Sequence, residues 1–126
     1  MFVHVDHINK VAELPDATTS MGRDLCFIWN ETNTGDLYFT DRTLYEGTYV
    51  NCQSLESLHT HFLDIDAEHI TGGISTLARD DILVAGTDGN LMAAASSAGY
   101  AIWFKVTDFV HLNDVAVRVQ IIVGDL

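Results

Sequence analysis

The sequence predicts a mainly β fold, a small single-domain β-barrel or β-sandwich with at most one or two short helices. Two observations predict it: runs of aromatic and β-branched residues alternate with Gly/Asp/Asn turn clusters, and only one short segment spaces its apolar residues convincingly at helical intervals. The chain has 126 residues, of which 48% are hydrophobic, so it can bury an ordinary core. This length suits one domain, and we expect it to span residues 1–126.

The first half of the chain contains three strand-type runs. Residues 24–29 (Asp-Leu-Cys-Phe-Ile-Trp) are followed by a polar loop at 30–36, and residues 37–40 (Leu-Tyr-Phe-Thr) resume the pattern. We interpret these segments as a hairpin with a loop of several residues. Residues 47–52 begin with a glycine and predict the next strand, and the N-terminal residues also have a strand-like composition.

The clearest hairpin lies in the second half. Residues 81–85 (Asp-Ile-Leu-Val-Ala) and 91–95 (Leu-Met-Ala-Ala-Ala) flank a turn with Asp-Gly at positions 88–89. Glycine tolerates the positive φ that tight hairpin turns require. We therefore expect two antiparallel strands joined at this turn.

Two further strands are expected near the C-terminus. Residues 100–106 (Tyr-Ala-Ile-Trp-Phe-Lys-Val) carry apolar side chains on both faces, which predicts burial on two sides, either inside a sandwich or against another chain. Residues 115–123 alternate most regularly. One face of that strand would carry Val115, Val117, Val119, Ile121 and Val123.

Helical periodicity is limited to residues 53–62, where Leu55, Leu58 and Phe62 follow an i, i+3, i+7 pattern. This spacing predicts a short amphipathic helix. A second short helical piece could cover residues 18–23.

The charge excludes several classes of function. Eighteen Asp and Glu residues oppose six Lys and Arg, a net charge of −12, so the chain lacks the basic stripe that nucleic-acid binding needs. No apolar run approaches the length of a membrane span and the N-terminus lacks a signal peptide, so we expect a soluble, unexported protein with no membrane partner. The acidity suits high local concentration, docking on a basic surface or a salty environment.

Residues 59–69 hold the densest group of candidate metal ligands. On a strand, His59 and His61 would share a face, which superficially resembles the His-x-His pair of metal-binding cupin barrels. The cupin glutamate after the second histidine is replaced at best by Asp66. Asp64, Asp66 and Glu68 alternate and could offer oxygens to calcium, but they lack EF-hand spacing, so we interpret them as a solvated acidic strand edge. A polar connection with solvated histidines is the alternative, so metal binding by these residues stays open.

Motifs for nucleophilic or nucleotide chemistry are absent from the sequence. There is no G-x-S-x-G elbow, no G-x-x-x-x-G-K-[ST] phosphate loop and no G-x-G-x-x-G fingerprint. We therefore expect neither an enzyme nor a cofactor.

The segment from residue 81 to residue 123 has a recurring order of features. A strand ends in an acidic Asp-Gly turn, small residues fill 91–98, a Gly-Tyr-Ala-Ile-Trp-Phe strand starts at Gly99, and an acidic spacer at 112–114 precedes the closing strand. This order resembles the small β-rich decoration, or head-stabilising, proteins of tailed-phage capsids. Trp103 and Phe104 are bulkier than the residues that this family usually has there.

The resemblance implies a structural role without catalysis. Such proteins bind the outer face of the capsid lattice, often as trimers, and clamp neighbouring major capsid subunits, so the expected location is the virion after assembly in the host cytoplasm. Neck, tail or fibre proteins would share these features. The alternatives of another class are a small cupin-like metal-binding protein that uses His59 and His61, and a generic bacterial interaction module. Candidate partner contacts are the N-terminal strand, which could extend a neighbour's sheet, the loop at 31–36 and the strand at 100–106 with apolar side chains on both faces. The single residues among these candidates are Phe2, Val3, Val5, Trp103 and Phe104.

Overall fold

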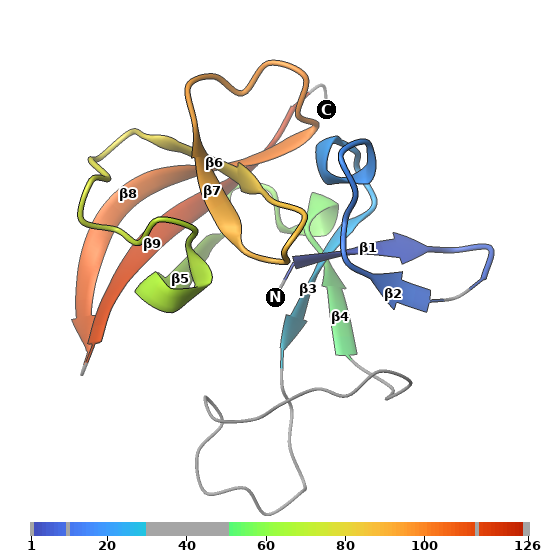
Figure 1. The fold of residues 1–126 in the computed structure, drawn as a ribbon, viewed down its shortest axis with the longest axis horizontal. Helices are drawn as coiled ribbons and strands as arrows, with labels where there is room; N and C mark the ends of the chain where they lie inside the picture. Colours follow the sequence, from blue (N-terminus) through green and yellow to red (C-terminus); the bar gives the residue numbers. More distant parts are fainter. Residues whose placement is uncertain (1, 10, 30–50, 113, 125–126) are drawn as a thin grey trace, which may run out of the picture.

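The computed structural model describes residues 2–9, 11–29, 51–112 and 114–124, which form two antiparallel sheets (Figure 1). The four-stranded sheet has the order β2 (Val11–Glu13), β1 (Phe2–Asp6), β3 (Leu25–Trp29) and β4 (Asn51–Ser54). The five-stranded sheet has the order β5 (Phe62–Asp66), β9 (Asp114–Val123), β8 (Ile102–Leu112), β6 (Ile82–Ala85) and β7 (Leu91–Ala94). The mainly β prediction is confirmed, and the arrangement is an open sandwich rather than a closed barrel.

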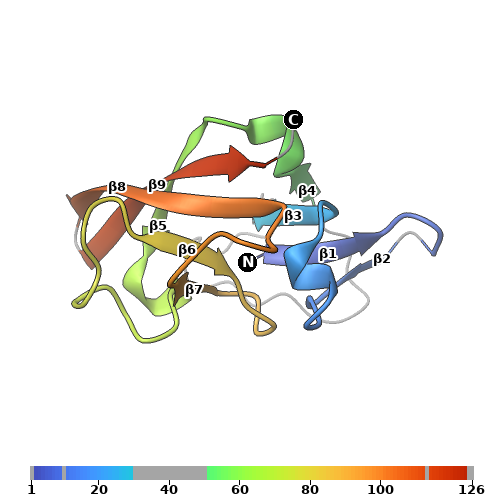
Figure 2. The same ribbon diagram turned by 90° about the horizontal axis from the view of Figure 1, so that it is seen from above.

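The main core lies where the two sheets meet. Phe2 of β1 packs against Phe27 of β3, with ring centroids 5.6 Å apart, and against Phe104 of β8, at 5.2 Å with the rings tilted by 62°. Edge-to-face contacts of this kind are favoured by the ring quadrupoles. The ribbon turned by 90° shows the start of β8 above one end of β3 and β1 (Figure 2). Other fully buried members of this cluster are Leu25, Leu55, Leu83, Ala85, Leu91, Ile102, Val106, Val117, Val119 and Ile121.

The predicted alternation of the closing strand is confirmed. Val117, Val119 and Ile121 of β9 are fully buried and Val123 is 3% exposed, whereas Arg118 on the other face is exposed. The preceding strand, β8, is longer than predicted and shifts register against β9 between Val106 and Asp108. A bulge of this kind adds a residue to one strand and keeps apolar side chains on the core face beyond it.

The predicted hairpin at 81–95 is also confirmed, as β6 and β7. Gly89 in its turn has φ +83°, which explains the glycine there. Asp88 holds the turn, since its Oδ1 accepts a hydrogen bond from the Asn90 backbone N–H at 3.0 Å and its Oδ2 accepts one from the Thr71 hydroxyl at 3.0 Å. The turn is therefore fixed both locally and to the segment before β6.

The predicted amphipathic helix at 53–62 is wrong. Gln53 and Ser54 belong to β4 and pair with β3, the 3-10 turn η3 covers only Glu56–Leu58, and Phe62 already starts β5. Strand pairing therefore overrides the helical spacing of the apolar residues at 55, 58 and 62. The piece expected at 18–23 is the 3-10 turn η1 (Thr19–Met21), and the third such turn in the described ranges is η4 (Ala67–His69).

Other expectations fall outside the described ranges or were missed. The loop at 30–36, the strand at 37–40 and residues 47–50 lie outside the described residues. The three-residue strand β2 was not predicted, whereas Asp64 and Asp66 do lie on an edge strand, β5. No helix in the described ranges is long and apolar enough to cross a membrane.

We expect Phe104→Ala to lower the free energy of unfolding by about 3 to 5 kcal/mol, because it removes a fully buried ring between the sheets. Phe62→Ala is the matched control, since its ring is 55% exposed on β5, and it should cost less than about 1 kcal/mol. Urea unfolding of both variants measures the difference. Equal losses would contradict the core described here.

Asp88 makes stability depend on pH. The Asn90 backbone hydrogen bond, with that from Thr71, holds the pKa of Asp88 below its usual 3.8. The charged carboxylate therefore stabilises the fold above that pH, and the stabilisation is lost as pH falls through the lowered pKa. Asp88→Asn should lower the melting temperature at about pH 7, and the difference from wild type should disappear by about pH 2. A difference that stays constant over this range would contradict the role of the charge.

Candidate functional site

The structure places His59 in a turn. Its ring is half-buried, and its Nδ1 accepts a hydrogen bond from the backbone N–H of Val123 in β9 at 2.9 Å. An accepting Nδ1 puts the proton of the neutral ring on Nε2. In this arrangement neither ring nitrogen has a lone pair available for a metal, and the histidine instead satisfies a backbone donor at the end of β9.

His61 lies beyond the same turn, directly before β5, and it is exposed. Thr60 between the two histidines has φ +71°, so the segment is not a strand. The strand that would put His59 and His61 on one shared face is therefore not formed, and the segment is a polar connection, the alternative that the sequence left open. The backbone hydrogen bonds of His61, to Leu58 and from Ile121, anchor the turn to its surroundings.

Asp64 forms an ion pair with Arg118. It lies opposite Arg118 in the β5–β9 register, and the guanidinium donates from Nε to Oδ1 at 2.8 Å and from Nη2 to Oδ2 at 3.2 Å. This two-point contact raises the pKa of Arg118 through its hydrogen bonds and the charge of Asp64. Phe62, Asp64 and Arg118 together line a surface depression on the outer face of the five-stranded sheet.

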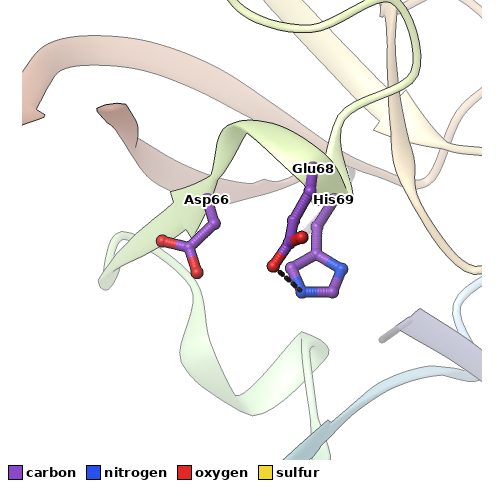
Figure 3. Close-up of side chains that lie close together, drawn as sticks. All are labelled: Asp66, Glu68 and His69. Atoms are coloured by element: carbon purple, nitrogen blue, oxygen red, sulfur yellow. Dashed lines mark ion pairs between the residues drawn. The ribbon is translucent and has the colours of Figure 1, made fainter. Parts of the chain in front are cut away.

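Asp66, Glu68 and His69 do converge (Figure 3). One ligand atom from each lies within 4.8 Å of the others, and His69 Nε2 is 3.9 Å from Glu68 Oε1. Asp66 ends β5, and the turn η4 carries the other two, both exposed. Two carboxylates and an imidazole could contact a divalent cation at three positions and leave the rest to water. Of the candidate metal ligands predicted at 59–69, the structure thus brings together only Asp66, Glu68 and His69.

The proposed partner contacts are mostly interior. Phe2 and Val3 are 2% exposed and Phe104 is fully buried, whereas Val5 and Trp103 are half-buried. The N-terminal strand β1 lies between β2 and β3, so it has no open edge for a neighbour's sheet. Core packing explains the apolar character of Phe2, Val3 and Phe104, but not that of Trp103. The expected edge addition through β1 is not available in this structure.

Each described Lys or Arg side chain forms an ion pair. The pairs are Arg23–Glu56 at 3.0 Å, Arg79–Asp108 at 3.1 Å, Lys105–Asp80 at 3.3 Å and Arg118–Asp64 at 2.8 Å. Other carboxylates hold turns, as Asp6 and Asp16 do, or contact a histidine, as Glu13 does. The electrostatic field at the described surface is consequently that of the excess carboxylates. Composition predicts this acidity, but residue spacing cannot show where on the surface the carboxylates lie.

No protein-family model, curated protein or solved structure matches this chain.

His59 and His61 can be separated experimentally. His59→Ala should lower the free energy of unfolding by about 1 to 3 kcal/mol, because it leaves the Val123 N–H without its acceptor. His61→Ala, the matched control on an exposed side chain, should change it by less than about 0.5 kcal/mol. Urea unfolding and metal analysis are made on the same samples. If the wild type binds a metal stoichiometrically and both variants lose it, the purely structural role of His59 would be contradicted and the cupin-like alternative would be supported.

Proposed function

We propose that the protein is a virion structural protein of the tailed-phage type, a capsid decoration subunit that binds and stabilises the lattice of the major capsid protein. The observation that carries the proposal is the order of features from residue 81 to residue 123. This segment forms β6, β7, β8 and β9, which are neighbours in one antiparallel sheet. The Asp-Gly turn falls between β6 and β7, as the resemblance implies, whereas the expected acidic spacer does not separate β8 from β9, since Leu112 and Asp114 belong to these strands and pair with each other.

The surface charge also supports a binding role. The chain carries 18 carboxylates and six Lys or Arg residues, and the described cations are already engaged in ion pairs. Uncompensated carboxylates attract a basic surface and repel nucleic acid. A positively charged face on a protein lattice is therefore the partner that fits.

The proposal includes a homo-oligomer, with a trimer favoured, and a location in the virion. A neck, tail or fibre subunit is the neighbouring alternative, and it differs in the partner that it would bind. Neither form of the proposal involves catalysis or a cofactor.

The test uses empty shells assembled from the major capsid protein of the same genome. Light scattering gives the mass of the purified protein alone, and co-sedimentation gives its occupancy on the shells. We expect saturable binding at a fixed ratio to capsid subunits and a higher temperature of shell disruption. An acidic protein of similar size serves as the control for non-specific adhesion.

Failure to bind these shells would contradict the decoration role. Binding to isolated tails or necks instead would assign the protein to that other part of the virion.

A further inference from the structure

Exposed large apolar side chains are concentrated in one part of the chain. In the described ranges six such residues are exposed, and four of them fall between residues 8 and 21. These are Ile8 at 91%, Leu14 at 53%, Val11 at 47% and Met21 at 37%. The other two, Phe62 and Met92, lie apart in the five-stranded sheet. Scattered single exposed residues need no explanation, but a local concentration indicates an interaction surface.

Three of these residues belong to the hairpin formed by β1 and β2 and its immediate continuation. The register pairs Asp6 with Val11, Ile8 lies in the connecting turn and Leu14 follows β2. In both ribbon views the hairpin projects from the body of the sandwich, with its turn far from the five-stranded sheet (Figures 1 and 2). The apolar side chains are thus carried on a protruding element.

The turn that presents Ile8 is held by Asp6. Its Oδ1 accepts hydrogen bonds from the backbone N–H groups of Ile8 at 3.0 Å and Asn9 at 3.1 Å, and its Oδ2 accepts one from the Asn9 side chain at 2.9 Å. Across the hairpin, His4 Nδ1 lies 3.2 Å from Glu13 Oε1. A turn fixed in this way loses little conformational entropy on docking, which favours binding.

β2 also exposes backbone along its outer side. Val5 donates its N–H to Asp24 at 3.0 Å, so the Val5 backbone faces β3. In an antiparallel ladder the opposite residue, Ala12, then points its N–H and C=O away from β1. β2 is the outer strand of its sheet in the described part of the chain, and all three of its residues are exposed.

The charges around the hairpin define the chemistry of its partner. Residues 2–16 hold three carboxylates, Asp6, Glu13 and Asp16, against one lysine, Lys10, whose side chain lies outside the described residues. Asp24 adds a fourth carboxylate beside the turn, where its Oδ1 lies 3.5 Å from His7 Nε2. A second copy would bring like charges together, whereas a surface with Lys and Arg would be attracted.

We propose that the β1–β2 hairpin is the docking element of this protein, and that Ile8, Val11 and Leu14 enter an apolar groove on a partner protein whose rim carries Lys and Arg. The inference rests on the proposed function and names the part of the subunit that meets the capsid lattice. Apolar contact supplies the affinity, and the surrounding carboxylates orient the hairpin on the basic rim.

The experiment compares two double variants on the same empty shells. Ile8→Ser with Val11→Ser changes the hairpin, and Phe62→Ser with Met92→Ser is the matched control, since it removes two exposed apolar side chains from the other sheet. We expect the hairpin variant to bind at least about tenfold less tightly, with the control close to wild type. Binding of the wild type should also weaken as salt is raised. Urea unfolding checks that both variants keep the wild-type fold.

The outcomes separate this inference from the proposed function. If the wild type binds the shells and the hairpin variant binds as tightly, the docking inference is overturned and the decoration role remains. Equal losses in both variants would likewise overturn it. If the hairpin variant loses self-association but keeps shell binding, the hairpin binds a second copy of this chain and the inference is wrong. A wild type that binds no shell overturns both.

Discussion

The contact of Phe2 with the opposite sheet is the interaction on which the rest of the structure depends. Its ring packs against Phe27 within its own sheet and against Phe104 across the core, and its backbone N–H donates to Gly89 O in the β6–β7 turn at 2.9 Å. One residue therefore joins both layers through side chain and backbone. A nearly fully buried aromatic ring brings a large apolar area out of water, and its T-shaped geometry sets how the layers approach.

This anchoring decides which surfaces remain available for binding. The start of β1 is held in the core, where it pairs with β3, and its far end pairs with β2 and continues into the projecting turn. Apolar residues at the buried end stabilise the fold, whereas Ile8 and Val11 at the projecting end are exposed. The same hairpin thus serves the core at one end and, in the function proposed here, a partner at the other.

Charge is organised by long-range pairing. Arg118 on β9 reaches Asp64 on β5, and Arg79 before β6 reaches Asp108 on β8, so cations in the described part are used to join neighbouring elements. Exposed pairs of this kind contribute little stability individually, about 0 to 1 kcal/mol. Their larger effect is to remove cations from the field around the molecule and leave its acidic character to the remaining carboxylates.

The sequence by itself determined the features that depend on neighbouring residues. The alternation of β9 and the Asp-Gly turn are local consequences of strand period and of glycine's tolerance of positive φ, so both could be predicted. Only the tertiary structure decided the rest, because pairing and burial need partners far along the chain. Strand pairing of Gln53 and Ser54 with β3 replaced the helix that the spacing indicated, and Val123, 64 residues away, engaged the His59 ring nitrogen that a metal would have needed.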